Sequence, residues 1–284
     1  MLLTDDLLLD YKRCQRRAFL NVYGQIEQKT PEREFLLKLQ RENQKQISEI
    51  LAGQHYWKPE FASRDWQAGA EQTWQFMQQG VELIYKGVLL LPPVSPSMPT
   101  LVGRPTFLRK YPGQSNLGSW HYLPVNVKLG KRPKPEYKLV AAFHAYILAR
   151  IQGLLPATSR LIVRQQREYD VDLNNWLPRL GEILSQCYAM LKAKVEPEVF
   201  ISRQRCSLCQ WHSSCHAIAQ SQRHLSLVPG VTPSRYQYLQ ERGINSLAAL
   251  AAASASQIEG EVLHPELARQ LQQQARSLLH DRPF

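Results

Sequence analysis

Three cysteines lie within ten residues in the text CSLCQWHSSC, at Cys206, Cys209 and Cys215. This C-x2-C-x5-C spacing lets the first two thiolates reach one metal ion or one cluster corner from a single turn. A third ligand six residues later closes another side of the same site. The chain has five cysteines in all, and an odd count with three of them clustered does not suit a disulfide framework. The spacing therefore predicts a metal site, which any fold of this segment must accommodate.

A fourth ligand must come from elsewhere in the chain. Cys14 is the obvious distant donor, whereas Cys187 lies in the apolar helical text EILSQCYAML and is expected to be a buried core residue. Zinc would take the three clustered cysteines with His212 or His216, since three cysteines and one histidine form a common zinc ligand set. An iron–sulfur cluster would use four cysteines, including Cys14. The spacing alone leaves both metals open.

The charge of the chain is strongly basic. Its 284 residues include 35 Lys and Arg against 24 Asp and Glu, a formal net charge of +11. This excess favours a polyanionic partner, with nucleic acid first and an anionic membrane surface second. A hydrophobic fraction of 44% provides a sizeable core and excludes a disordered tail. No apolar run is long enough to span a membrane, and the start MLLTDDLLLDYKRC has acids where a signal peptide needs basic residues, so we expect a cytoplasmic protein.

Hydrophobic periodicity predicts an α/β body followed by a helical tail. Helices are expected over residues 31–51, 64–79 and 135–153, and over 173–194 with an interruption near Pro178. Short apolar or alternating segments at 81–93, 100–111, 119–130 and 159–170 each predict a strand. From about residue 224 the chain predicts a turn at Pro229–Gly230 and two short helices, capped by Thr232 or Ser234 and by Ser246 and separated by a glycine stop at Gly243.

One predicted strand carries a candidate catalytic group. Asn126 and Lys128 are two residues apart and therefore point to the same side, and Thr106 in the preceding strand can face them. A metal-dependent phosphodiesterase needs two or three carboxylates to hold Mg²⁺ and a lysine to polarise water or phosphate. Lys128 suits the lysine role, but Asn126 and Thr106 are neutral and do not suit the carboxylate roles. Taken alone, the N-x-K pattern indicates a solvated lysine more readily than a catalytic one.

Several segments in order resemble a known family. They are YKRCQRRAFL, EREFLLKL, GRPTFL, YLPVNVKLGKRPKPEYKLVAAFHAYIL, the cysteine triad, and LSLVPGVTPSRYQYLQERGINSLAALA, which looks like a helix-hairpin-helix module. Over nearly its whole length the chain resembles the RecB-like nucleases of the PD-(D/E)XK superfamily, especially the iron–sulfur-stapled members such as the CRISPR-associated adaptation nucleases and AddB. The resemblance implies a restriction-endonuclease-like mixed sheet flanked by helices over residues 1–222. A small all-α helix-hairpin-helix domain is expected over 223–284.

The resemblance also selects between the two metals. In stapled family members, one N-terminal and three C-terminal cysteines hold a [4Fe–4S] cluster, and Cys14, Cys206, Cys209 and Cys215 occupy that pattern here. Such a cluster would pin the chain's first helix to its last, in a structural rather than a redox role.

The implied nuclease centre is incomplete. Family members have an aspartate where this chain has Thr106, and an aspartate or glutamate where it has Asn126; Lys128 matches, and Glu34 corresponds to the acid of the first helix. With two carboxylates missing, we do not expect tight binding of Mg²⁺ or Mn²⁺. Loss of one essential charged group usually removes orders of magnitude of rate. The catalytic centre is therefore expected to be inactive or impaired.

What remains is a scaffold for binding nucleic acid, in first place the DNA backbone, without reading its sequence. The backbone N–H groups of the tail hairpin would face a phosphate at a helix start. Two alternatives stay open: an active Mg²⁺- or Mn²⁺-dependent nuclease with rearranged ligands, and a protein–protein scaffold that uses the C-terminal domain. The expected contacts to nucleic acid come from Arg104, Lys131, Arg132, Lys134, Gly230, Val231, Thr232 and Arg235.

Overall fold

The chain folds into two compact units. The computed structural model describes residues 1–93, 95 and 98–280. The first unit comprises Met1–Val22 and Arg33–Glu196, and the second comprises Tyr23–Glu32 and Pro197–Phe284. The predicted domains, residues 1–222 and 223–284, are defined by sequence motifs rather than by contacts in space, and they stay a prediction. None of the helices in the described part of the chain combines the length and apolarity of a membrane span.

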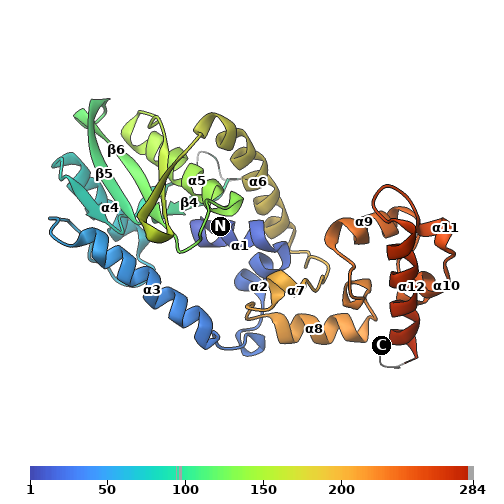
Figure 1. The fold of residues 1–284 in the computed structure, drawn as a ribbon. Coiled ribbons are helices and arrows are strands. Elements are labelled where there is room, and N and C mark those ends of the chain that lie inside the picture. The colour runs from blue at the N-terminus through green and yellow to red at the C-terminus, as the bar shows by residue number, and fades with distance from the viewer. Residues whose placement is uncertain (94, 96–97, 281–284) are drawn as a thin grey trace. The chain divides into compact units, whose positions relative to one another are not determined.

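The first unit contains two small β-sheets with helices packed around them (Figure 1). The larger sheet has the strand order β2-β5-β6-β7-β8, in which β6 and β7 run parallel and the other neighbours antiparallel. The smaller sheet has the order β1-β4-β3, with β1 parallel to β4. These mixed sheets flanked by helices confirm the α/β class. Along the chain the elements are β1 (Leu2–Thr4), α1 (Asp5–Arg13), α2 (Gln15–Tyr23), α3 (Glu34–Leu51), α4 (Trp66–Gln78), β2 (Leu83–Tyr85), β3 (Leu89–Leu91), β4 (Thr100–Gly103), β5 (Phe107–Ser115), β6 (Gly118–Val127), α5 (Pro135–Gln152), β7 (Ser159–Val163), η2 (Arg164–Gln166), β8 (Arg167–Val171) and α6 (Leu173–Ala193).

The two faces of the larger sheet pack against different helices. Successive residues of a strand point to opposite faces. Phe107 and Val125 therefore join a core with the C-terminal half of α3, whereas Leu108 and Leu161 join the larger core that contains α5. Helix α5 is buried along most of its length, and α1 and α6 contact it. Residues at the end of β6 are consequently held between two helical layers.

Three segments that the sequence predicted as single strands are each divided in two, so those predictions were wrong. Residues 81–93 form β2 and β3, and 100–111 form β4 and β5, with one strand of each pair in each sheet. In 100–111 the chain changes sheets at Arg104–Thr106, where Pro105 lacks the N–H that a strand ladder needs. In 159–170 the chain reverses at Gln165 and Gln166, whose φ values of 64° and 56° are left-handed.

Helix α6 runs without interruption through Pro178, so the predicted break was also wrong. A proline inside a helix removes the hydrogen bond to the carbonyl four residues earlier. Here that carbonyl belongs to Asn174, an exposed residue of the first turn, where water can satisfy it. Cys187, further along α6, is fully buried as predicted.

Among its described residues the second unit contains helices and connecting loops but no strand. The tail of this unit packs around a core of apolar residues that includes Leu239, Leu250 and Leu271. The predicted caps are confirmed: the Thr232 side chain accepts a hydrogen bond at the start of α9, and Ser246 does so at α10. The elements are η1 (Ile26–Gln28), α7 (Arg203–Cys206), α8 (His212–Ser221), η3 (Leu225–Leu227), α9 (Pro233–Glu241), α10 (Leu247–Ala252), α11 (Ala255–Ile258) and α12 (Pro265–Leu279).

A polar network holds the start of this tail. The Tyr236 hydroxyl donates to Glu198 Oε1 at 2.5 Å, and His224 Nε2 lies 3.3 Å from the same oxygen. The other ring nitrogen of His224 accepts the backbone N–H of Ser226 at 3.0 Å. The hydroxyl of Ser226 in turn accepts the N–H of Ile201 at 2.9 Å. Residues 198–201 are therefore bound to η3 and α9 by side-chain hydrogen bonds.

Candidate functional site

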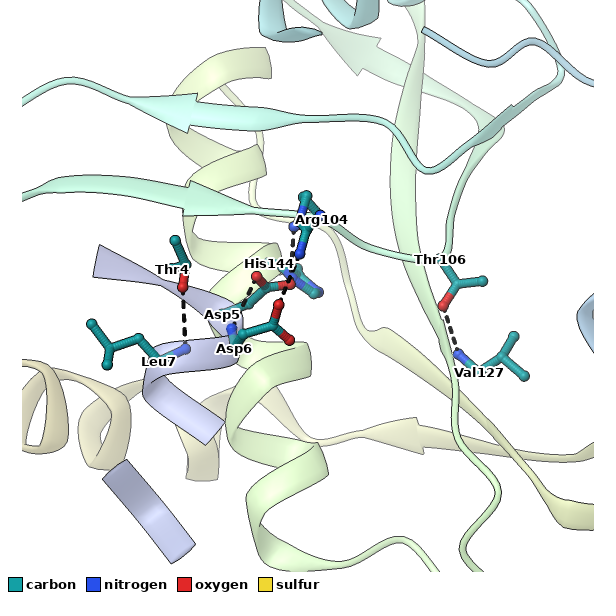
Figure 2. Close-up of polar contacts among 8 residues, drawn as sticks. All are labelled: Thr4, Asp5, Asp6, Leu7, Arg104, Thr106, Val127 and His144. Atoms are coloured by element: carbon teal, nitrogen blue, oxygen red, sulfur yellow. Dashed lines mark hydrogen bonds and ion pairs between the residues drawn. The ribbon is translucent and has the colours of Figure 1, made fainter. Parts of the chain in front are cut away.

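The predicted centre lies where β5 begins and β6 ends. Thr106 directly precedes β5, and its hydroxyl accepts the backbone N–H of Val127 at 3.0 Å (Figure 2). Asn126 lies in β6, and Lys128 follows the strand and continues its pairing with β7 by donating its N–H to Ile162 at 2.8 Å. The structure thus brings Thr106, Asn126 and Lys128 together on adjacent strands.

Asn126 and Lys128 face the layer that contains α1 and α5, because Val125 and Val127 pack on the opposite face. The Asn126 side chain is 2% exposed, and its Nδ2 has no hydrogen-bond partner in the described part of the chain. Lys128 is half-buried, and among the described residues its ammonium group makes no hydrogen bond or ion pair. Burial lowers the pKa of Lys128, against the opposing effect of the nearby Asp5 and Asp6 carboxylates.

Asp5, at the start of α1, is a member of this site that sequence reasoning missed. Its Oδ2 lies 2.9 Å from Nε2 of His144 on α5 and accepts the N–H of Arg104 at 3.1 Å. Its Oδ1 accepts the N–H of Asp6 at 3.1 Å. Burial alone would raise the pKa of Asp5, but the hydrogen bond and charge of His144, together with Arg104, lower it to about 2. Asp5 is therefore ionised, and its carboxylate oxygens are already hydrogen-bonded.

Asp6 and Arg104 form the outer part of the same cluster (Figure 2). Arg104 Nη2 donates to Asp6 Oδ2 at 2.8 Å, and the guanidinium lies 4.9 Å from the ring centroid of Trp66. Arg104, which the sequence predicts as a phosphate contact, is exposed but already engaged on two sides. Two acids in the first turn of a helix are a common feature. The sequence therefore offered no sign that Asp5 meets a histidine 139 residues away.

The buried Asp5–His144 pair has a consequence for acid stability. The pKa of Asp5 is depressed from 3.8 to about 2, so its contribution to stability is complete above about pH 5 and is lost as the pH falls toward 2. We expect Asp5→Asn to lower the free energy of unfolding at pH 7 by about 2 to 4 kcal/mol, since it removes one partner of a buried pair. Urea unfolding between pH 2 and pH 7 would measure this. The exposed Asp6→Asn control should cost less than about 1 kcal/mol. Equal losses of unfolding free energy in the two variants would contradict a stabilising role of the buried Asp5–His144 pair.

Glu34, the predicted acid of the first helix, is not brought to this centre by any contact that the structure records. It is the exposed first residue of α3, and no hydrogen bond or ion pair among the described residues joins it to Thr106, Asn126 or Lys128. Helix α3 packs on the sheet near its other end, where Gln46 Nε2 donates to the Val163 carbonyl at 3.0 Å. Twelve residues of helix correspond to about 18 Å of axial length.

The predicted phosphate contacts Lys131, Arg132 and Lys134 are exposed in the loop between β6 and α5. This loop is fastened to the turn after β7, since the Gly130 carbonyl accepts the N–H of Arg164 at 3.1 Å. The carboxylates on the neighbouring strand β8 are paired with Arg160. We call the exposed cations of the loop, of the turn and of the first position of β8 the basic loop surface; they are Lys131, Arg132, Lys134, Arg164 and Arg167.

Several polar groups of the predicted tail hairpin are bonded within the hairpin itself. The N–H of Val231 donates to the Val228 carbonyl at 3.1 Å, and Val231 itself is buried. Arg235 Nη1 donates to the Gly230 carbonyl at 2.7 Å, and the N–H of Arg235 bonds to the Thr232 hydroxyl. Gly230 has a φ of 89°, which favours glycine. The Val231 N–H and two Arg235 nitrogens, the backbone N–H and Nη1, are thus used inside the hairpin.

The four predicted cluster ligands are half-buried, with Cys14 in the first unit and the other three in the second. Cys14 caps the end of α1, and its Sγ accepts the N–H of Arg17 at 3.4 Å. Cys206 Sγ accepts the N–H of Ser202 at 3.3 Å. Within the described ranges, no group of three or more Cys, His, Asp or Glu side chains is arranged to hold a metal ion. For Cys187, burial raises the pKa of the thiol to about 12, as expected of an inert core residue.

Comparison of the sequence with models of protein families found no match, and neither did a search of curated proteins.

Proposed function

We propose that the protein binds nucleic acid, in first place DNA, through a centre derived from a RecB-family nuclease that no longer cleaves. The observation that carries this proposal is the pair of neutral residues beside Lys128. The Thr106 hydroxyl accepts a hydrogen bond from the N–H of Val127, and Asn126 is a buried amide. Mg²⁺ gives up its water reluctantly and is normally held by carboxylates. The donors present do not fit Mg²⁺ or Mn²⁺.

The strand order supports the finer fold assignment. Strands β2, β5 and β6 are antiparallel neighbours, and α5 then connects β6 to the parallel strand β7. We propose that this is the restriction-endonuclease-like sheet that the resemblance implies, with Thr106, Asn126 and Lys128 at the family's catalytic positions.

A second candidate is an active nuclease with rearranged ligands. It is favoured by one observation, namely that the carboxylates of Asp5 and Asp6 both bond to Arg104, two residues before Thr106. Asp5 is already hydrogen-bonded by three donors, and Asp6 is paired with Arg104. A metal ion would have to displace these partners, so we place this candidate second.

We further propose that Cys14, Cys206, Cys209 and Cys215 hold a [4Fe–4S] cluster. The donor chemistry fits, because the ligand set is four thiols outside any disulfide framework. The sulfurs of Cys14 and Cys206 accept N–H groups from Arg17 and from Ser202, and hydrogen bonds to the sulfurs are a usual feature of such clusters. When bound, the cluster supplies a cross-link between distant parts of the chain.

The basic loop surface gives the DNA proposal its test. The logarithm of the DNA affinity falls linearly with the logarithm of the salt concentration. Each phosphate that Lys or Arg neutralises makes this slope steeper by about 0.7 to 0.9. We expect the triple variant Lys131→Glu/Arg132→Glu/Lys134→Glu to lower DNA affinity at least about tenfold and to flatten the salt slope by about 2. Fluorescence anisotropy of a labelled oligonucleotide over a salt series would measure both quantities.

Charge reversal at three other exposed lysines is the matched control, using Lys12, Lys58 and Lys192. If the control weakens binding as much as the loop variant, net charge rather than this surface governs the affinity. If the natural protein shows no salt-dependent DNA binding at all, the protein–protein scaffold takes the place of the DNA proposal.

A further inference from the structure

Two hydrogen-bond donors at the end of β6 have no acceptor in the described part of the chain. They are the Asn126 amide, which is 2% exposed, and the half-buried ammonium group of Lys128. A buried polar group without a partner costs free energy, and folded proteins contain few of them. The two side chains lie on one face of the strand, about 7 Å apart along it. Together they indicate an acceptor that none of the described residues provides.

The nearby acids do not fill this role. Asp5 is bonded to His144 and to backbone N–H groups, and Asp6 is paired with Arg104. Both carboxylates are therefore already bonded to groups other than Lys128. Thr106 cannot supply a negative charge either, since it is neutral. The unpaired charge at the end of β6 is thus the ammonium group, next to an amide donor.

We propose that this centre holds a phosphate group of the nucleic acid directly, without a metal ion, through the Lys128 ammonium group and the Asn126 amide. This inference rests on the proposed function and names the ligand chemistry of its centre. A centre with two carboxylates repels phosphate until a divalent cation bridges them. Having the neutral residues Thr106 and Asn126 in place of two carboxylates lowers that repulsion and leaves the lysine charge for the phosphate. The change that removes catalysis thereby creates a metal-free anion site.

The first experiment compares DNA affinity in EDTA and in Ca²⁺ by anisotropy of a labelled oligonucleotide. The natural protein should bind equally well, within about twofold, in both. Asn126→Asp should lose at least about tenfold in EDTA, because it places a negative charge beside the phosphate. Ca²⁺ should recover part of that loss. The control Asn175→Asp makes the same charge change at an exposed position of α6 and should bind like the natural protein.

The second experiment needs no DNA and uses inorganic phosphate as the probe. Phosphate should raise the Tm of the natural protein above that in chloride at equal ionic strength, and Lys128→Met should lose this stabilisation. Far-UV circular dichroism checks that both variants fold. If Asn126→Asp does not fold, the comparison of Lys128→Met with the exposed control Lys192→Met decides.

The outcomes separate this inference from the proposed function. Salt-dependent DNA binding that neither Asn126→Asp nor Lys128→Met weakens would overturn the inference and leave the function standing. So would binding by the natural protein that EDTA abolishes, since the phosphate would then need a metal. Absence of DNA binding, with Lys128-dependent stabilisation by phosphate, would overturn the function and support the anion site.

Discussion

The natural protein is expected to leave end-labelled single- and double-stranded DNA uncut in Mg²⁺ or Mn²⁺, whereas Thr106→Asp/Asn126→Asp is expected to cut it. Thr106 and Asn126 already lie on adjacent strands beside Lys128, with the Thr106 hydroxyl 3.0 Å from the Val127 nitrogen. The double variant therefore adds the two missing carboxylates to a lysine that is in place. Removing such groups from working enzymes costs orders of magnitude in rate, so restoring them should lift cleavage above background.

Two further variants make this prediction specific. The single variant Thr106→Asn, which keeps the natural Asn126, is the control. Its new side chain has the shape of aspartate without the charge, so this variant should stay inactive. Adding Lys128→Ala to the double variant should abolish the new activity. Cleavage by the natural protein that disappears in Lys128→Ala would instead show that other residues supply the metal ligands. The second candidate, with Asp5 and Asp6, would then replace the impaired centre.

Cys14→Ser is expected to remove the cluster and to destabilise the protein. Anaerobically purified natural protein should be brown and hold about four iron atoms per chain, the content of one [4Fe–4S] cluster. The serine variant should be colourless and should unfold at lower temperature, because a cross-link between distant segments restricts the unfolded chain. Iron content, visible absorbance and thermal unfolding measure the three effects.

Cys187 provides the matched control for this experiment. It is fully buried in α6 and is not one of the four predicted ligands. Cys187→Ala should keep the iron and lose only packing energy. Colourless natural protein with one zinc per chain would overturn the cluster and favour the three clustered cysteines with His212 or His216 as ligands.

Local chemistry allowed several parts of the structure to be predicted from the sequence. The caps at Thr232 and Ser246 and the glycine stop at Gly243, with φ of 74°, follow from residue preferences at helix ends. The burial of Cys187 follows from its place in an apolar helical pattern. The neutral residues Thr106 and Asn126 could be placed together because they lie on predicted strands that follow one another in the chain, and the two strands do pair.

Other features depend on pairings that no short segment encodes. Pro105 and the left-handed residues Gln165 and Gln166 divide segments whose sequences predict continuous strands. The sheet that each half joins depends on partners far away in the sequence. The burial of Asp5 against His144 has the same origin. The unpaired state of the Asn126 amide is visible only once its whole environment is assembled. Periodicity identifies which face a residue takes, but not what it meets there.

The hydrogen bonds around Glu198 determine how the tail can be dissected. A fragment that begins at residue 223, where the sequence modules divide, would keep Tyr236 and His224 but lose the carboxylate they share. It would also lose Phe200, whose ring centroid lies 5.5 Å from the ring centroid of Tyr236. The tail expressed in isolation should therefore start no later than Pro197. A shorter piece that fails to bind DNA would reveal damage to its fold rather than the absence of a binding surface.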